Sequence, residues 1–582
     1  MANAFSLSDI SSELVIQILH YCEYTSILSF TSTCKAYYEL VAQSISLQLH
    51  IELEVNGLEL VKDSFKRNAD YFTILQELQR FRDAWLKLDF EAPVERLVGS
   101  SEMLLWELRE GFYIRAFSSE DGLFSDTLQF IPLDSKIPDS PPLSFDFTFN
   151  EFTTDPGQGL FAILSRSMQR DMSVHIHLRS SSTGLAHPLA RHPLLTAVLD
   201  FEPPYVWPGF SIEIMGDMVL AKVSLPQTHM YELLVWNWKF GILLHRIGSR
   251  QGICDYAFLD QQHLVVLSGS PSIQSHLGTL ALLIYAISEN VSTHSYPLNT
   301  GQIRISDAPI SQPILCLELP QIKQSCVLSE TGFFLRSQPT PGRAMYTASA
   351  TFACPYARTF SMTFSCHGSI DNWGSRAYYR VFVDGRFLLD QARTAPRNGT
   401  KVLPWFSWGE RATRWLVAPE ESDHWISWMS GSRFITSLPH HPYYCVFDFS
   451  RPIVSRFRDS FAQLHPVTPD QSNGFYTTEG AFQNLAHLGG DICQFSVNSP
   501  PNHEFFTITV GEDQPSIIEI DEYLGFQEPI TSRLPFRLVF RTDKKRKHGG
   551  WQINGDCVLG ITSGETSETI TIYRLEMNEQ TT

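Results

Sequence analysis

From about residue 85 onward, apolar and polar residues alternate, and this two-residue period constrains the fold more than any other feature of the sequence. Val174, Ile176 and Leu178, for example, alternate with His175 and His177. Such alternation is typical of β-strands that have one buried face, and the spacing of helices almost disappears from this part of the chain. We therefore expect residues 85–582 to form a large all-β domain.

The expected strands are short and follow one another at intervals of about ten residues. The chain has 33 prolines and 34 glycines for turns, and 40 phenylalanines that suit strands. Gly111 lies between two alternating runs and predicts a hairpin. The clearest strands are expected at residues 103–108, 112–117, 174–178, 231–238, 242–247, 256–259, 263–267, 280–287, 378–382, 425–428, 443–449, 505–510, 536–540, 558–561 and 570–575.

A β-propeller is the closed architecture that holds many short strands without exposing long sheet edges. Residues 234–241 look like the end of a WD-type repeat, with Asn237 where an aspartate is usual. The strand inventory fits six or seven blades. Because a ring of blades has one seam, we expect residues 569–575 to share a sheet with residues 85–90 or 103–117.

The first 45 residues behave differently, because their apolar residues follow helical spacing. Ile10, Leu14 and Ile18 recur every four residues and predict a first helix. Thr25 or Ser26 is expected to cap a second helix, since a hydroxyl accepts a hydrogen bond from a free first-turn amide. A third helix follows. About 40 residues are marginal for a free-standing core, so we expect part of the apolar surface to face a partner.

Residues 44–56 are ambiguous, because their apolar residues fit both a strand and a helix. We favour a helix, since no breaker separates them from the preceding helix and Gly57 suits a helix C-cap. Residues 69–85 show clearer helical spacing. A helical linker over residues 51–84 is thus expected to join a small all-α unit, residues 1–50, to the β domain, which makes the chain α+β and multidomain.

The N-terminal stretch resembles the F-box family, whose pattern is Leu-Pro, then Glu-Leu, Ile-Leu, a Leu-Leu pair, and Val-Cys-basic-x-aromatic. Ile10 and Ser11 stand in place of the Leu-Pro, so the proline that favours the first helical turn is missing, and Thr33 replaces the valine. The whole layout resembles a fungal F-box protein with a degenerate C-terminal propeller. The matching positions are Glu13, Leu14, Ile18, Leu19, Ile27, Leu28, Cys34, Lys35 and Tyr37.

The resemblance implies that the helices dock on a Skp-family adaptor, which ties the chain to a cullin and a ubiquitin-conjugating enzyme. The β domain would hold an unknown protein substrate, as the recognition subunit of an SCF-type ubiquitin ligase, and contribute proximity rather than covalent chemistry. The alternative is a propeller interaction scaffold that acts outside any ubiquitin ligase. The residues expected to bind the adaptor are Ile10, Leu14, Ile18, Leu19, Ile27, Leu28, Phe30 and Cys34.

Charge and cysteine usage bear on partners and compartment. The net charge of −18 argues against nucleic acid as a partner. The 10 cysteines show no paired spacing and are expected to be free thiols of a reducing compartment. We find no signal-peptide pattern, and the longest apolar run, residues 280–287, is too short to cross a membrane. We expect a cytoplasmic protein. The basic stretch KKRK at 544–547 would allow nuclear import if it were an import patch, but we favour a solvated hairpin loop.

Sequence motifs for catalysis, cofactors or phosphate binding are not found. His175 and His177 share a strand face, as ligands in metal sites do, but no third ligand is nearby in sequence and strand alternation explains both. We therefore expect no enzyme activity, no cofactor and no metal. The five tryptophans between residues 405 and 428 are expected mainly in blade cores, although one or two of them would suit a ligand channel.

Overall fold

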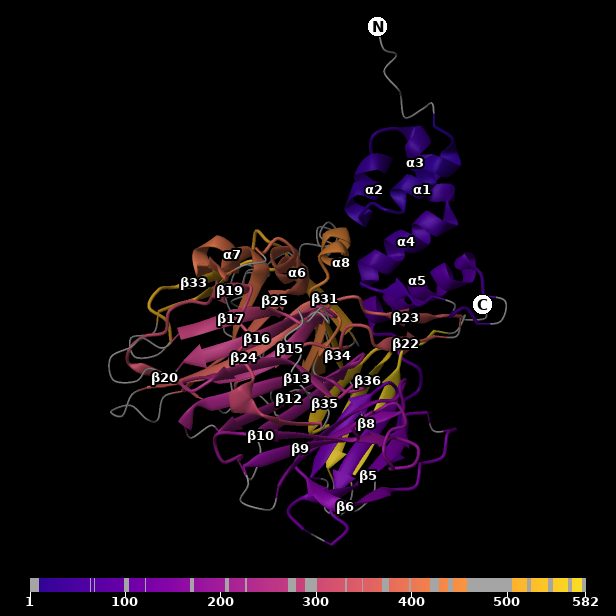
Figure 1. Ribbon diagram of the computed structural model, residues 1–582. Helices are drawn as coiled ribbons and strands as arrows, with labels where there is room; N and C mark the ends of the chain where they lie inside the picture. The colour runs from indigo at the N-terminus through magenta and orange to yellow at the C-terminus, as the bar shows by residue number, and fades with distance from the viewer. Residues whose placement is uncertain are drawn as a thin grey trace, which may run out of the picture.

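The computed structural model places a small helical part against a large β body (Figure 1). It describes residues 10–62, 64–66, 69–98, 104–120, 122–134, 136–167, 172–204, 209–225, 228–270, 279–287, 301–329, 332–347, 349–368, 376–396, 399–418, 429–437, 443–457, 505–520, 525–542, 548–563 and 568–577.

The described ranges contain eight α-helices, and five of them precede the β body. The helix favoured for residues 44–56 is confirmed, and Gly57 ends it in the left-handed conformation with φ of 64°. A side chain at Gly57 would collide with Arg358 of the β body. The helices are α1 Ser12–Leu19, α2 Tyr24–Thr31, α3 Lys35–Gln43, α4 Ile45–Asn56, α5 Tyr71–Lys87, α6 Gly385–Arg393, α7 Trp405–Ala412 and α8 Arg451–Phe457.

Helices α1 to α3 and the first turn of α4 share a small apolar core. The cap predicted for the second helix is wrong, because α2 begins at Tyr24, before Thr25 and Ser26. The Tyr24 N–H donates a hydrogen bond to the Glu54 carboxylate on α4, so a neighbouring helix satisfies the first-turn amide in place of a hydroxyl. The buried residues of this core are Val15, Leu19, Ile27, Val41 and Leu47.

The helical linker is packed onto the β body. Strand β1 (Glu59–Leu60) pairs with β23 (Thr351–Ala353), which also pairs with β22 (Ala344–Tyr346). The Arg358 guanidinium donates a hydrogen bond of 2.8 Å to the Val55 carbonyl near the end of α4. Helix α5 continues past the boundary predicted at residue 84 and packs its apolar face on the body. The linker therefore holds the helical part in a fixed position.

Seven sheets of four or five strands make up most of the described β body, and we number them in chain order (Figure 1). Their strands are mostly neighbours in sequence and pair antiparallel. Sheet 1 contains β3 Leu105–Arg109, β4 Phe112–Phe117, β5 Ser125–Pro132 and β6 Leu143–Phe149; sheet 2, β7 Glu151–Asp155, β8 Leu160–Arg166, β9 Ser173–Ser180, β10 Leu194–Val198 and β18 Gln302–Arg304; sheet 3, β11 Phe210–Met215, β12 Met218–Leu225, β13 Met230–Asn237 and β14 Ile242–Ser249.

The later sheets collect strands from more distant parts of the chain. Sheet 4 contains β15 Ile253–Asp260, β16 His263–Ser270, β17 Thr279–Ala286, β19 Leu315–Glu318 and β26 Lys401–Leu403; sheet 5, β20 Cys326–Leu328, β21 Phe334–Arg336, β24 Thr359–Gly368, β25 Arg376–Asp384 and β27 Thr413–Ala418; sheet 6, β28 Met429–Ser430, β29 Arg433–Ser437, β30 Tyr443–Asp448, β31 Phe505–Val510 and β34 Phe536–Thr542; sheet 7, β2 Val94–Leu97, β35 Gly550–Asn554, β36 Cys557–Ser563 and β37 Glu568–Arg574. A further pair is β32 Ser516–Ile518 with β33 Ile530–Ser532.

Most of the strands expected from the two-residue period are present, but they are fewer than half of the strands in the seven sheets, because β5 to β8 and β10 to β12, for example, were not expected. The hairpin expected at Gly111 is confirmed as β3–β4, with φ of 81° at that glycine. Asn237 ends β13, where its side-chain oxygen accepts a hydrogen bond of 3.1 Å from the Phe240 amide. Asn237 therefore shapes the turn into β14, at the end of the stretch that looks like a WD-type repeat.

The first and last strands of the body lie in one sheet. In sheet 7, β2 pairs antiparallel with β37, with Val94 opposite Ile572 and Leu97 opposite Thr569. An isolated bridge joins Phe90 to Leu575. Residues 569–575 therefore pair with an early segment, but the two partner stretches predicted for them are wrong. The partner strand is β2, residues 85–87 belong to α5, and Phe90 contributes an isolated bridge.

Apolar clusters lie between successive sheets, and the series returns to its start. One cluster contains buried residues of both sheet 7 and sheet 1. Each cluster has buried members from two sheets. In order from sheets 1–2 to sheets 7–1, examples are Ile114 and Phe161, Ile176 and Trp236, Val235 and Phe258, Leu282 and Met362, Phe382 and Phe447, Val446 and Val558, and Ile572 and Tyr113.

The expectation that helical spacing almost disappears after residue 85 is wrong in three places, at α6, α7 and α8. Helix α6 follows directly from strand β25, because the Asp384 carboxylate accepts hydrogen bonds from the amides of Arg386 and Phe387. Leu388 and Trp408 then bury the apolar sides of α6 and α7 against sheets 4 and 5. Short capped helices of this kind are hidden in a sequence dominated by strand alternation.

Candidate functional site

The structure divides the predicted adaptor-binding residues into exposed and buried groups. Leu14, Ile18 and Leu28 are 51%, 50% and 48% exposed. Leu19 and Ile27 are buried in the core of the helical part instead. Because Leu14 and Ile18 are four residues apart on α1, they share one face of that helix. These three exposed side chains can contact a partner directly, whereas the two buried ones can act only by supporting the helices.

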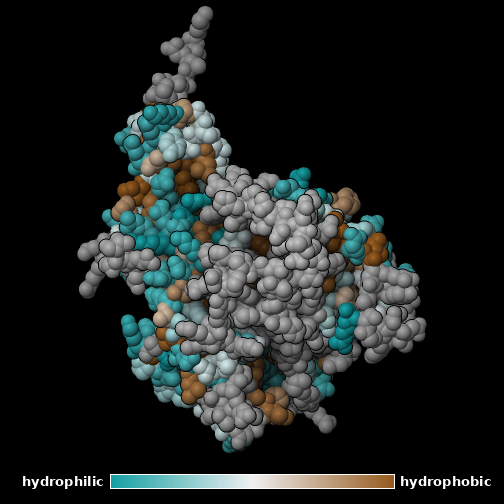
Figure 2. Space-filling model, turned by 180° about the vertical axis from the view of Figure 1, so that it is seen from behind, coloured by the Kyte–Doolittle hydropathy of each residue, from teal (hydrophilic) through white to brown (hydrophobic). Residues whose placement is uncertain are grey.

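The remaining predicted residues are mixed. Ile10 and Phe30 are partly buried against the same core, and Cys34 is exposed just before α3. Sequence reasoning missed Tyr21 and Tyr38, which are 94% and 60% exposed. Tyr21 lies in the break after α1, outside the helical stripe on which the prediction was based. Figure 2 shows apolar side chains gathered on the helical part, at the upper left of that view.

We call Leu14, Ile18, Tyr21 and Leu28 the exposed helical set. Large apolar side chains in such number on helices of this length are unusual for a surface that meets only water. The core of the helical part is formed by other residues, such as Val15, which lies between Leu14 and Ile18 in the sequence. The exposed helical set is therefore not part of the core that holds the helices together. The exposed helical set is the first candidate site.

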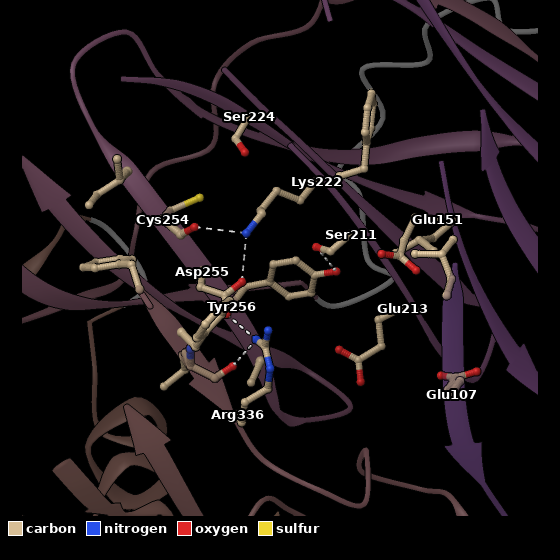
Figure 3. Close-up of a pocket in the computed structure, with 18 of the residues that line it drawn as sticks. Glu107, Glu151, Ser211, Glu213, Lys222, Ser224, Cys254, Asp255, Tyr256 and Arg336 are labelled. Atoms are coloured by element: carbon tan, nitrogen blue, oxygen red, sulfur yellow. Dashed lines mark hydrogen bonds and ion pairs between the residues drawn. The ribbon is translucent and has the colours of Figure 1, made fainter. Parts of the chain in front are cut away.

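A cavity of about 440 Å³ in the β body is the second candidate site (Figure 3). Its walls come from β3, β7, β11, β12, β15 and β21, which belong to sheets 1 to 5. Strands β3, β7, β11 and β15 are the first strands of sheets 1 to 4, so the cavity lies where the starting edges of these sheets converge. Ligand sites of proteins commonly have this volume and combine apolar walls with a few polar groups.

Asp255 organises one side of the cavity. Its carboxylate accepts hydrogen bonds from the Lys222 ammonium at 3.0 Å, from the Leu335 amide at 2.9 Å, and from the Arg336 guanidinium. The Lys222 ammonium also donates to the Cys254 carbonyl at 3.2 Å. Burial by itself would raise the pKa of Asp255, but Arg336 and Lys222 lower this pKa below its ordinary value. Asp255 thus forms ion pairs with both Lys222 and Arg336.

Glu107 and Arg109 form a buried ion pair on the opposite side. Glu107 also accepts hydrogen bonds from the Thr153 hydroxyl at 2.8 Å and from the Thr154 amide at 2.9 Å. A second carboxylate, Glu213, lies 4.0 Å from the Arg109 guanidinium. Burial opposes the charge of Arg109, yet Glu107 and Glu213 together raise its pKa. Arg109 is therefore shared between two carboxylates.

Glu151 and Tyr256 face the same space (Figure 3). The Glu151 carboxylate accepts a hydrogen bond of 3.0 Å from the Phe152 amide, and no cation lies within ion-pair distance of it among the described residues. Burial first, and then the charge of Glu107, raise the pKa of Glu151 to about 8. The Tyr256 hydroxyl accepts a hydrogen bond of 3.2 Å from Ser211, and burial raises its pKa. At neutral pH the cavity thus holds a protonated carboxyl and a neutral phenol.

Sequence reasoning missed the cavity altogether. Its one available signal is a charged residue that interrupts an otherwise apolar strand, as Lys222 does in β12 and Asp255 does in β15. Such residues are rarely buried without a partner. Which of these charges come together depends on contacts between sheets, and a single sequence does not give those contacts.

The histidine pair serves the packing within sheet 2 and between sheets 1 and 2. His177 forms a hydrogen bond of 2.9 Å with the Ser165 hydroxyl and stacks on Phe147, with ring centroids 3.7 Å apart. Burial lowers the pKa of His177 to about 3. His175 forms a hydrogen bond of 3.0 Å with the Thr196 hydroxyl. Within the described ranges, no group of three or more His, Cys, Asp or Glu side chains could hold a metal ion.

The tryptophans expected in blade cores lie in two settings. Trp415 is buried on β27, as expected, whereas Trp405 and Trp408 belong to α7 and none of these three lines the cavity. Trp425, Trp428 and the KKRK stretch at 544–547 lie outside the described residues.

Nine cysteines of the described part are free thiols. No helix in the described ranges is long and apolar enough to cross a membrane.

Comparisons with known proteins give little guidance. No protein-family model matches the sequence, and no curated protein matches it. Among solved structures, the polysaccharide lyase Uly1 is similar at 7% sequence identity and a TM-score of 0.33, over 82% of this chain and 90% of that chain. Drosophila Plexin A in complex with Semaphorin 1b is similar at 6% identity and a TM-score of 0.22, over 62% of this chain and 85% of that chain. Likenesses of this strength carry no argument about function.

Proposed function

We propose that this chain is the substrate-recognition subunit of an SCF-type ubiquitin ligase, in which the helical part binds a Skp-family adaptor and the β body binds a protein substrate. The observation that carries this proposal is the exposed helical set, whose residues Leu14, Ile18 and Leu28 fall at F-box positions and stand about half exposed. An adaptor that covers these side chains would remove their apolar area from water, which is the main favourable term in most protein association.

The attachment of the helical part supports the same function. A ligase receptor acts by holding its substrate close to the transferring enzyme, so a stiff connection between the docking surface and the substrate-binding body is an advantage. Here β1 pairs with β23, and the Glu77 carboxylate on α5 accepts hydrogen bonds from the Thr347 hydroxyl at 2.9 Å and the Ser349 amide at 3.2 Å. These contacts hold the linker and α5 against the body, next in the chain to the helices that carry the exposed helical set.

For the body itself we propose a seven-bladed β-propeller, with sheets 1 to 7 as its blades. The support is the pairing of β2 with β37 and the apolar cluster that joins sheet 7 to sheet 1. Closure of this kind removes the open sheet edges that an array of seven sheets would otherwise expose. In such a ring the first strands of the blades surround a central channel, where the cavity would then lie.

The competing function is a propeller scaffold that assembles partners outside any ubiquitin ligase. The missing Leu-Pro favours it. Mixing the purified full-length protein with a purified Skp-family adaptor separates the two functions. The ligase proposal predicts a stable one-to-one complex that also recruits a cullin, measured by size-exclusion chromatography with light scattering. A protein that stays monomeric beside a tenfold excess of adaptor would support the scaffold instead.

A further inference from the structure

The cavity in the β body has more negative than positive charge available to a ligand. Four carboxylates and three cations line it. Lys222 and Arg336 are both held by Asp255, and Arg109 is held by Glu107. The two carboxylates left over are Glu151 and Glu213. The only cation near Glu213 among the described residues is the shared Arg109 at 4.0 Å, and its carboxylate also accepts a hydrogen bond from the Thr340 hydroxyl.

Glu151 is the group whose environment is incomplete. Its carboxyl points into the cavity near the hydroxyls of Ser211 and Tyr256, and Glu213 points into the same space from β11 (Figure 3). Burying a carboxylate without a cation is costly, and the raised pKa of Glu151 reflects that cost. A cation placed between Glu151 and Glu213 would supply the missing partner.

The walls suit a cation on an apolar stem. Phe152, Phe210 and Ile212 line the cavity beside the carboxylates, so methylene groups of a long side chain would be covered while its charged end reaches Glu151. Leu104 and Arg336 in the lining keep part of their surface in contact with solvent, which leaves a route for a side chain to enter. The net charge of −18 would also draw basic segments toward the protein.

We propose that this cavity binds a basic side chain, an arginine or lysine of a partner polypeptide, with its cationic group between Glu151 and Glu213. The cavity would then be the place where the body recognises its substrate, and only this last step rests on the proposed ligase function. Acidic phosphate or carboxylate groups are disfavoured, because each cation in the lining already has a carboxylate partner.

Binding of an arginine should depend on pH through Glu151. The other titratable groups that face the cavity are Glu107 and Arg109 on β3, Glu213 on β11, Lys222 on β12, His229 before β13, Cys254, Asp255 and Tyr256 on β15, and Arg336 on β21. Burial lowers the pKa of His229 and raises the pKa values of Cys254 and Tyr256, while Asp255 has a lowered pKa. Each of these shifts moves the group away from the range near pH 8, where Glu151 titrates.

The test is isothermal titration calorimetry of the full-length protein with the tripeptide acetyl-Gly-Arg-Gly-amide. The citrulline tripeptide, which has the same shape and no charge, is the ligand control. The ionised fraction of Glu151 rises from about a tenth at pH 7 to about nine tenths at pH 9, so the affinity for the arginine peptide should rise about tenfold. Binding at pH 7 should also release a proton, so the measured heat should change with the ionisation heat of the buffer.

Two variants complete the experiment. Glu151→Gln should weaken binding of the arginine peptide at least tenfold at pH 9 and abolish the pH dependence, while Glu120→Gln at an exposed position should change neither. If Glu151→Gln does not fold, as judged by circular dichroism, Glu213→Gln is used in its place. The proposal is overturned if the citrulline peptide binds as tightly as the arginine peptide, if the variant binds like the wild type, or if no saturable binding occurs. Adaptor binding measured on the same samples shows separately whether the ligase proposal stands.

Discussion

Ile572 is the residue whose replacement tests closure of the body most sharply. It lies on β37 directly opposite Val94 of β2, is 3% exposed, and belongs to the apolar cluster that also contains Tyr113 and Ile131 of sheet 1. Ile572→Ala removes three carbon atoms, which costs about 2.4 kcal/mol at roughly 0.8 kcal/mol per buried methylene. The cavity left behind adds to this loss, so we expect a total of about 3 kcal/mol.

Chemical denaturation gives the size of the effect, and amide hydrogen exchange read by mass spectrometry shows where it is felt. If sheet 7 closes on sheet 1, exchange should accelerate in residues 105–132 as well as in residues 550–574, although the first range is more than 400 positions away in sequence. Ile310→Ala, at a position 48% exposed, is the matched control and should cost less than about 0.5 kcal/mol. Faster exchange confined to residues 550–574, or a loss below about 1 kcal/mol, would refute the closure argument.

Two further predictions concern single chemical groups. The folded-state pKa of Glu151, about 8, lies above its ordinary value of 4.5, so this group favours folding below pH 4.5 and loses that contribution as the pH rises toward 8. Between pH 4.5 and pH 7 the free energy of unfolding of the wild type, measured in urea, should therefore fall by about 3 kcal/mol relative to that of Glu151→Gln. Parallel pH profiles of the two proteins would show that the carboxyl is not buried as described. The nine free thiols of the described residues predict that thiol titration of the denatured, non-reduced protein finds nearly all 10 cysteines reactive; recovery of six or fewer would contradict this.

The sequence predicted those features that depend on local period. Alternation located β3, β4, β9 and β13 to β17, helical spacing located α5, and Gly57 marked the end of α4. Edge protection predicted that the last strand pairs with an early segment, but it did not identify β2 as that segment. Features that depend on contacts between distant segments were not predictable. Glu54 rather than Thr25 satisfies the start of α2, because the fold of α4 brings that carboxylate there.

The candidate sites divide in the same way. The helical stripe identified Leu14, Ile18 and Leu28 as apolar surface, but it also included Ile27, which the three helices bury together. Periodicity shows that one side of a helix is apolar, yet it does not show how much of that side a neighbouring helix covers. The cavity required Glu151 of sheet 2 and Asp255 of sheet 4 to converge, and nothing in either strand predicts the other.

Direct binding of a Skp-family adaptor to the exposed helical set tests the central proposal. The measurement is the dissociation constant of the purified adaptor for the full-length protein and for the double variant Leu14→Asp with Leu28→Asp. Both positions are about half exposed, so the charges should leave the helices folded, unlike a charge at the fully buried Ile27. Leu123→Asp, at an 88% exposed position on the β body, is the matched control. We predict that the double variant weakens binding at least a hundredfold, equivalent to about 2.7 kcal/mol, and that the control leaves it unchanged. Equal affinity of the wild type and the double variant would contradict the account.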